Sequence, residues 1–394
     1  MMPAHRQRQI SMPDLTASLP AIAALGVAVC GVALHMVAAF RLRRHLRVPS
    51  TVENADTPPL TLWRALKGGV PDLDGKLDAL VHGSRAEDQI LLGVDAGSAE
   101  FSVCENLRTR HPGRLIEVVA CERDRVPNPK ISKFIQMAPH ARHAHWLLTD
   151  SEAMPDADFI ENFRREWSAS GADVQTAGYR FANLRNFPQA LDASPALLTL
   201  WPGLMLAGRI AFTLGACTGV KAEDIRALGG WETLGADLAE DHQLGAQLSA
   251  KGRTIRLSRN VLTLDSDPMT WREYLRHQHR VAVTYRAATP AGALGLPVLH
   301  TLGFAAVAAA LHPLSVKYGA PISIVHLAVA HVVLARIAIA AVFSQALDFP
   351  ILRLTLAVLL SAFIESAMWL VAWLPSGVWW AGRWRRVGWR GRLS

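Results

Sequence analysis

The sequence predicts an α/β domain with a largely parallel sheet, held between hydrophobic segments that are long enough to cross a membrane. Three observations predict this arrangement. The chain of 394 residues is 51% apolar and only 19% charged, whereas a soluble domain is about one quarter charged. The apolar residues gather in long runs near the two ends of the chain. The stretch between them alternates short apolar runs with helical patterns, as parallel-sheet folds do.

The composition excludes a disordered or collagen-like chain. The net charge of +8, from 41 Lys and Arg against 33 Asp and Glu, fits nucleic acid, an anionic membrane surface or a phosphate-bearing substrate. We expect no nucleic acid as a partner, because the arginines cluster beside the apolar runs, where anionic lipid accounts for them. The four cysteines are scattered without a C-x-x-C spacing, so neither a zinc site nor a disulfide framework is expected: Cys30, Cys104, Cys121 and Cys217.

The first apolar run predicts a transmembrane anchor over residues 17–40. It contains no Asp, Glu, Lys or Arg and meets the length of about 20 residues that a bilayer helix needs. Four arginines follow it directly, from Arg41 to Arg47. The positive-inside rule therefore places this end in the cytoplasm, and the N-terminal tail, residues 1–16, outside.

The C-terminal membrane region, residues 290–375, contains about three hydrophobic segments, at 291–311, 320–343 and 351–374. The basic tail that follows, residues 376–394, has five arginines among tryptophans, a composition that suits the lipid headgroup layer. Four crossings in total would place this tail outside, whereas its arginines favour the cytoplasm. One segment, best 291–311 with its Pro and Gly, is therefore expected to be interfacial or re-entrant. Arg336 inside the second segment fits either helix packing or a functional role.

The middle of the chain supplies the elements of the sheet. The expected strands are 60–66, 89–94, 116–121, 145–149 and 174–179, and the expected helices are 73–82, 99–110, 131–142 and 158–168. Ligands of such folds gather beyond the carboxyl ends of the strands. Residues 197–214, with Trp201 and Arg209, are expected to lie in the membrane interface. If they crossed the membrane, the candidate site residues Asp150 and Asp241 would be on opposite sides.

Carboxylates follow two of the expected strands, with Asp95 after the second and Asp150 and Glu152 after the fourth. Such carboxylates hold a diphosphate through Mg²⁺ or Mn²⁺, although turn or helix-capping roles also explain them. A third acidic site is Glu240-Asp241. It either complements a helix dipole or supplies a general base, Asp241, for an acceptor hydroxyl.

A basic stretch from Tyr274 to Arg286 contains His277 and Arg280. Three roles fit it: a solvated basic helix, a surface for lipid headgroups, or a clamp on a departing diphosphate, which arginine can hold through two hydrogen bonds.

Taken together, these segments resemble the ceramide glucosyltransferase family, glycosyltransferase family 21, including its bacterial branch associated with hopanoid biosynthesis. The resemblance covers nearly the whole chain and rests on the order and spacing of several short segments. They are Arg64-Ala-Leu-Lys67-Gly68, Gly93-Val-Asp95, Asn128-Pro-Lys130, Thr149-Asp150-Ser-Glu152, Cys217-Thr-Gly219, Leu228-Gly-Gly-Trp231, Ala239-Glu240-Asp241 and His277-Gln-His-Arg280.

The resemblance implies a GT-A-type, Rossmann-like glycosyltransferase domain over residues 41–289, facing the cytoplasm from a bacterial inner membrane. It also implies a UDP-sugar donor, carrying glucose or N-acetylglucosamine, and a lipid acceptor such as ceramide or a hopanoid. A single displacement assisted by one base would invert the anomeric carbon. A processive polysaccharide synthase and a non-catalytic membrane scaffold are the alternatives.

Carried over residue by residue, the family pattern implies these roles: Asp95 near the nucleotide, Asp150 with Glu152 on Mg²⁺ or Mn²⁺ and the diphosphate, Lys130 near the donor, His277 and Arg280 on the diphosphate, Asp241 as the base, and Glu240 and Lys67 as further candidates. The sequence departs from that pattern at four places: Val281 replaces a Trp, His277 a Gln or Arg, and Glu152 an Asp, and Asp95 is followed by Ala-Gly-Ser.

Overall fold

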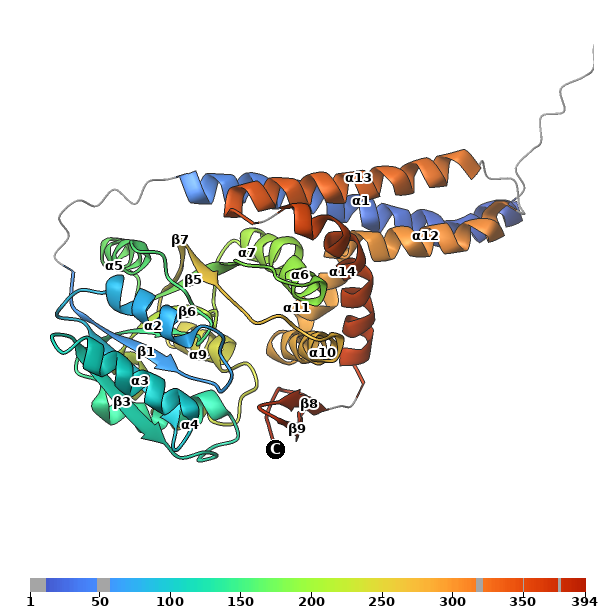
Figure 1. Ribbon diagram of the computed structural model, residues 1–394. Helices are drawn as coiled ribbons and strands as arrows, with labels where there is room; N and C mark the ends of the chain where they lie inside the picture. Colours follow the sequence, from blue (N-terminus) through green and yellow to red (C-terminus); the bar gives the residue numbers. More distant parts are fainter. Residues whose placement is uncertain (1–11, 48–56, 317–321, 350, 375–376) are drawn as a thin grey trace, which may run out of the picture.

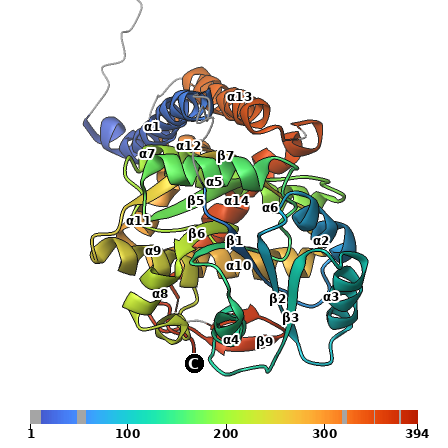
Figure 2. The same cartoon turned by 90° about the vertical axis from the view of Figure 1, so that its left-hand side faces the viewer.

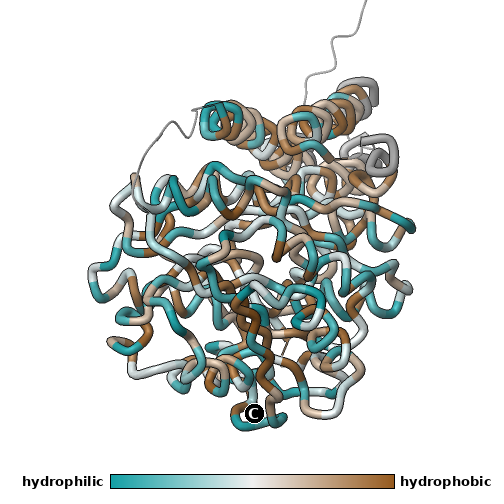
Figure 3. Tube along the Cα trace, turned by 60° about the vertical axis from the view of Figure 1, so that its left-hand side comes forward, coloured by the Kyte–Doolittle hydropathy of each residue, from teal (hydrophilic) through white to brown (hydrophobic). Residues whose placement is uncertain are grey.

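The computed structural model describes residues 12–47, 57–316, 322–349, 351–374 and 377–394. Most of the predicted N-terminal tail lies outside these ranges. An α/β domain forms the body of the molecule, and long helices from both ends of the chain lie along one side of it (Figure 1). Hydrophobic segments run through the centre of the domain, with hydrophilic segments mainly around them (Figure 3).

The body is built on a seven-stranded mixed sheet in the order β3-β2-β1-β4-β6-β5-β7. Strands β1 to β4 run parallel to one another, and β5 runs parallel to β7. Strand β6 is antiparallel to both of its neighbours, β4 and β5. The strands are β1 (Leu60–Ala65), β2 (Gln89–Asp95), β3 (Leu115–Cys121), β4 (His145–Thr149), β5 (Val174–Phe181), β6 (Cys217–Lys221) and β7 (Ile255–Leu264).

Helices cover both faces of the sheet (Figure 2). They are α2 (Leu73–His82), α3 (Ala99–Arg110), α4 (Pro129–Met137), α5 (Phe159–Ser170), α6 (Phe187–Pro195), α7 (Trp201–Leu206), α8 (Ala222–Leu228), α9 (Glu240–Ala250) and α10 (Trp271–Ala288). Shorter helical turns lie between them: η1 (Ala138–His140), η2 (Ala196–Leu200) and η3 (Trp231–Leu234).

All five expected strands and all four expected helices of this region are present, and the bounds of α2 and α3 are those expected. Helix α4 begins two residues early, because Asn128 caps it by accepting from the backbone N–H groups of Lys130 and Ile131. Strands β6 and β7 were not predicted. Strand β6 is short and includes Gly219, where an added Cβ would lie 2.9 Å from the ring of Trp167. Because nearly all of β6 is buried, its sequence lacks the alternation of apolar and polar residues that would have predicted a strand.

The long helices are α1 (Met12–Arg47), α12 (Thr301–Val316), α13 (Ile322–Leu347) and α14 (Ile351–Ala372). Helices α1, α12 and α13 pack against one another. Residues 19–47 of α1 and 327–347 of α13 are long and apolar enough to cross a membrane. Helix α1 continues beyond the expected anchor and rests on the α/β body, where His45 Nε2 donates to the carbonyl of Ser258 at 3.0 Å.

The segment before α12 is irregular. Helix α11 (Pro290–Gly295) and turn η4 (Leu296–Leu299) meet α12 at a bend of 64°. Helix α14 packs against α6 and α10 of the α/β body as well as against α12 and α13. Arg336 of α13 is 2% exposed and donates to the backbone carbonyls of Val358 and Leu299. These bonds tie the helices together, which is a packing role.

Residues 197–214 are more deeply buried than the expected interfacial element, apart from the turn after α7. Most of the segment is core: Leu197 and Trp201 are fully buried, and Trp201 Nε1 donates to the carbonyl of Tyr179 at 2.9 Å. Only residues 207–209 and 211 are exposed. The segment lies under α1, which covers the apolar side chains that we expected to face lipid.

The basic tail also differs from the expectation. It folds into a hairpin of β8 (Gly377–Trp380) and β9 (Arg383–Arg386) that packs against α10. The hairpin lies on the opposite side of the body from α1 and α13 (Figure 1 and Figure 2). Three arginines of the tail pair with carboxylates of the body: Arg383 and Arg385 with Asp124, at 2.8 Å and 3.5 Å, and Arg392 with Asp237 at 3.7 Å. These arginines are thus neutralised by protein instead of lipid headgroups.

Candidate active site

The two strand-end aspartates are linked by α4. Lys130 and Lys133 lie one turn apart on this helix, Lys130 pairing with Asp150 at 2.7 Å and Lys133 with Asp95 at 2.6 Å. The cap residue of the same helix, Asn128, donates through Nδ2 to Glu240 at 3.1 Å. The start of α4 therefore joins the ends of β2 and β4 to the start of α9.

Lys130 stands at the centre of this arrangement. Its ammonium lies 2.7 Å from Asp150 Oδ1, 3.4 Å from Glu240 Oε1 and 3.3 Å from the carbonyl of Gly215. Burial lowers the pKa of Lys130, but the charges of Asp150 and Glu240 outweigh burial and raise the pKa above its ordinary value. The lysine is therefore a fixed cation among carboxylates.

Asp241 lies in the first turn of α9, next to Lys130. Its Oδ1 accepts the backbone N–H of His242 at 2.8 Å, and its Oδ2 lies 2.9 Å from where a Cβ on Gly215 would stand. Burial raises the pKa of Asp241, the charge of Lys130 opposes that rise, and the net pKa is above the ordinary value. A buried carboxylate with a raised pKa is a stronger proton acceptor than an exposed one.

The remaining carboxylates differ in their partners. Asp95 is also paired with Arg123 at 2.9 Å, so it is held by two cations at the edge of the site. Glu152, two residues after Asp150, forms an ion pair with Lys67. Both lysines that the sequence singled out, Lys67 and Lys130, therefore contact the carboxylates expected to hold a metal.

The donor set can be tested against a divalent cation. Within the described residues, no group of three or more His, Cys, Asp or Glu side chains lies close enough to hold a metal ion. Mg²⁺ in nucleotide sites needs only one or two carboxylates, because phosphates and water supply the other oxygens. Asp150 and Glu152 are partly exposed, with side chains 40% and 26% accessible. Two accessible carboxylates at a strand end fit that requirement.

The two residues of α10 that the sequence singled out, His277 and Arg280, are both held by other side chains of the protein. His277 Nδ1 donates to Asp192 Oδ1 of α6 at 2.6 Å, and Gln278 donates to the same oxygen at 2.8 Å. Arg280 lies over the ring of Trp380, 5.8 Å from its centroid, within the range of a cation–π contact. The motif tryptophan that is missing at Val281 is thus matched by a tryptophan from the tail hairpin beside the same arginine.

Several residues of the site escaped sequence reasoning. Asp192 is almost fully buried; burial would raise its pKa, but His277 overrides burial and keeps the pKa below its ordinary value. Tyr179 and Tyr285 were not singled out either. Burial, and then the charges of Glu365 and Asp241, raise the pKa of Tyr285 to about 12. Neither a lone Asp in an apolar helix nor a tyrosine carries a sequence signal, although Lys133 stood in a segment already marked by Lys130.

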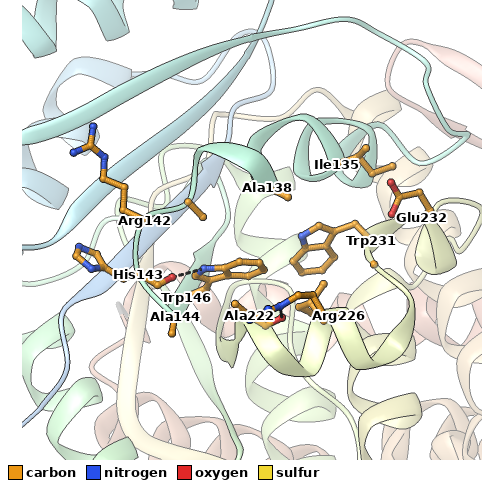
Figure 4. A pocket seen from close by; sticks show the side chains of 13 residues that line it. Ile135, Ala138, Arg142, His143, Ala144, Trp146, Ala222, Arg226, Trp231 and Glu232 are labelled. Atoms are coloured by element: carbon orange, nitrogen blue, oxygen red, sulfur yellow. Dashed lines mark hydrogen bonds between the residues drawn. The ribbon is translucent and has the colours of Figure 1, made fainter.

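A cavity of about 500 Å³ lies elsewhere, at the amino end of β4 (Figure 4). It is lined by Trp146, Trp231 and Arg142 among others, and the two tryptophan rings stack at 6.2 Å. The carboxylates described above follow the opposite, carboxyl end of β4. This cavity is therefore separate from the candidate active site.

The site thus combines a strand-end carboxylate pair, a half-buried carboxylate with a raised pKa, and Lys130 between them. A family model for glycosyl transferase family 21 matches residues 21–393. The protein belongs to this family and is a glycosyltransferase.

Comparison with one of two solved structures agrees on the fold. A mannosyltransferase from Pyrobaculum calidifontis, solved in complex with GDP-mannose and Mn²⁺, is similar with a TM-score of 0.53 and 17% identity, over 87% of this chain and 99% of that chain. TarS of S. aureus, solved with UDP-GlcNAc, has a TM-score of 0.39 and 11% identity, over 83% of this chain and 96% of that chain. A search of curated proteins finds no significant match.

Proposed function

We propose that this glycosyltransferase transfers a hexose or N-acetylhexosamine, glucose or N-acetylglucosamine, from a UDP-sugar to the hydroxyl group of a membrane lipid such as ceramide or a hopanoid. The observation that carries the proposal is Asp241, a half-buried carboxylate with a raised pKa, held beside Lys130 and thereby connected to the strand-end Asp150. A general base must be protonated by the acceptor, and a raised pKa favours that transfer.

The proposed reaction is one displacement. Asp241 takes the proton of the lipid hydroxyl while the hydroxyl oxygen attacks the anomeric carbon of the sugar. The bond from that carbon to the β-phosphate oxygen breaks, and UDP leaves with the electron pair. Attack from the face opposite the leaving group inverts the anomeric configuration.

Asp150 and Glu152 would hold Mg²⁺ or Mn²⁺, which neutralises diphosphate charge when bound. The Mn²⁺ of the Pyrobaculum mannosyltransferase supports this assignment by analogy of fold. Lys130 and Arg280 would face the donor, and His277 would do so while Asp192 orients its ring. Asp95 would lie near the nucleotide, where Lys133 and Arg123 restrain it.

A lipid acceptor is supported by the contact between the apolar helices and the site. Helix α14 packs on α6 and α10, the two helices that carry Asp192 and His277. Burial raises the pKa of Tyr285, and the charges of Glu365 on α14 and of Asp241 raise it further. On this proposal, a lipid lying along the apolar helices would bring its hydroxyl past α10 toward Asp241.

The topology follows from the same contacts. We infer three crossings, through α1, the bent pair before α13, and α13, with α14 lying against the catalytic body. Three crossings place the tail in the compartment of the catalytic domain, as its ion pairs with Asp124 and Asp237 require. By the positive-inside rule, the arginines after residue 40 favour the cytoplasm as that compartment. The membrane would then be a bacterial inner membrane.

The test is a comparison of lipid extracts, by mass spectrometry, from cells that express the wild-type protein, the Asp241→Asn variant or neither. We expect a lipid heavier by one hexose or one N-acetylhexosamine in the wild-type extract alone. The mass added identifies the sugar, and the parent lipid identifies the acceptor. Equal amounts of the product in the Asp241→Asn extract would refute the role of the base, and no new glycolipid in any extract would refute the lipid acceptor.

A further inference from the structure

A second charged region lies far along the chain from the candidate active-site residues, at the end of α1. The exposed apolar surface of this helix includes Met36 and Val37 and ends at Phe40, which is 70% exposed. Arg41 follows immediately. A change from exposed apolar to basic residues within one turn marks the boundary between hydrocarbon and headgroups.

At this boundary the structure has a groove of about 600 Å³. Three separate parts of the chain form it: the end of α1, the exposed turn after α7 and the start of β7. They contribute five arginines, which are Arg41, Arg44, Arg209, Arg256 and Arg259. We call this feature the basic groove. Apolar side chains, among them Leu204 and Met205, form the remainder of its wall.

The arginines of the basic groove have no counter-charge of their own. Throughout the described residues, no carboxylate lies within ion-pair distance of their guanidinium groups. The one acid that lines the groove, Glu166, accepts from the hydroxyl of Ser258 at 2.6 Å and from the side chain of Asn260 at 3.0 Å. Five guanidinium groups against one carboxylate leave an excess of four positive charges.

The walls of the basic groove are tied together. Arg41 donates to the carbonyl of Met205 at 3.0 Å, and His45 donates to the carbonyl of Ser258 at 3.0 Å. The first bond joins α1 to α7, and the second joins α1 to β7. The arginines from the three segments are thus brought together by fixed backbone and not by chance encounters of loose side chains.

We propose that the basic groove binds the phosphate headgroup of an anionic glycerophospholipid. Guanidinium groups match phosphate oxygens through paired hydrogen bonds. The adjoining apolar wall and the exposed Phe40 suit the glycerol backbone and the start of the acyl chains, which a soluble phosphate lacks. The proposal needs α1 to enter the membrane, but it does not depend on which sugar or acceptor the active site uses.

The test uses the full-length protein in neutral detergent. Native mass spectrometry measures the binding of phosphatidylglycerol and of phosphatidylcholine with the same acyl chains. An arginine near an anionic lipid surface strengthens binding about fivefold. We therefore expect the wild-type protein to prefer phosphatidylglycerol. The variant Arg44→Gln/Arg209→Gln/Arg256→Gln should lose this preference, with binding about one hundredfold weaker.

The matched control removes three exposed arginines from other surfaces: Arg108→Gln/Arg142→Gln/Arg226→Gln. This variant should bind phosphatidylglycerol within about twofold of the wild type. If the first variant does not fold, Arg209→Gln alone, in an exposed turn, should weaken binding about fivefold. Glycerol phosphate and inorganic phosphate are added in excess as competitors, and neither should displace the lipid.

Three results would overturn the proposal. The wild-type protein binds both lipids equally, the groove variants keep the full preference for phosphatidylglycerol, or inorganic phosphate displaces the lipid. The last result would identify the groove as a site for soluble anions.

Discussion

Two charged regions of this glycosyltransferase differ in whether the protein supplies the opposing charge. Around Lys130, three carboxylates face one ammonium group: those of Asp150, Glu240 and Asp241. In the basic groove, five guanidinium groups face one carboxylate. The first region is held in place by its own ion pairs before any ligand arrives, although it keeps an excess of negative charge. The second has a positive excess that only an external anion can neutralise.

The comparison separates two uses of charge. Catalysis needs side chains whose positions and protonation are set in advance, and buried pairing achieves both. Attraction to a surface needs charge that is accessible and uncompensated. The following variants disturb the first region and its surroundings, in order of expected effect.

Replacing Asp241 by Asn should have the largest effect. The amide keeps the size of the side chain but cannot accept the proton, so turnover should fall by about 10²- to 10⁴-fold. UDP binding, measured by calorimetry, should change little, because the proposed base would contact the acceptor and not the donor. Turnover at the wild-type level would show that the raised pKa serves no catalytic purpose.

Lys130→Gln should weaken the network and shift its pH response. The charge of Lys130 lowers the pKa of Asp241 against the rise caused by burial, so removing it should raise that pKa further. A general base works only when ionised, so the wild-type rate should fall as pH drops through the pKa of Asp241. The acid limb of the kcat profile should therefore move to higher pH, with turnover reduced about tenfold or more. An acid limb at the same pH as in the wild type would show that Lys130 does not influence the pKa of the base. Lys133→Gln, whose lysine pairs with Asp95 instead, is the control and should leave the limb in place.

Asp192→Asn should weaken the binding of the UDP-sugar donor. The buried carboxylate orients His277 and Gln278, and the neutral amide holds both less firmly. We expect kcat/KM for the UDP-sugar to fall about tenfold, a typical cost of losing an orienting interaction at a site. The loss should reside mainly in KM for the donor, whereas a purely structural role would lower the amount of folded enzyme and leave KM unchanged. The control is Asp173→Asn, at the residue directly before β5.

Trp380→Ala should have the smallest effect. The ring contacts Arg280 at the outer limit of a cation–π interaction, which is worth about 0.5–1 kcal/mol at an exposed site. KM for the donor should rise about two- to fivefold. Trp380→Phe keeps an aromatic face and should recover most of the loss. Identical KM values for the alanine variant and the wild type would exclude a positioning role for the tail hairpin.

Much of the fold could be predicted because its elements carry local signals. Strands such as β2 and β4 are apolar runs that end in aspartate, and α2 and α3 have clear helical spacing. Strands β6 and β7 were not predicted, because they form a sheet through their neighbours and not through a local pattern. Strand β6 pairs antiparallel with both β4 and β5. Strand β7 carries Arg256, Arg259 and Asn260, which are typical of a loop.

The same distinction holds at the site. Asp95, Asp150 and Asp241 were singled out because they stand at strand or helix ends, and the structure gives each of them charged surroundings. Asp192 was missed because its importance lies in a contact with His277, 85 positions away along the chain. Periodicity reports only on near neighbours, so it carries no information about such a pair.

The sequence by itself determined the class of the protein: an α/β glycosyltransferase of family 21 with apolar helices at both ends. Its residues carry that information through local composition, spacing and motif order. Only the tertiary structure decided that Lys130 joins the acidic sites, that the basic tail returns to the catalytic body, and that arginines from three segments share one groove. Charge acts through space over a few ångströms, and the distances that govern it exist only once the chain has folded.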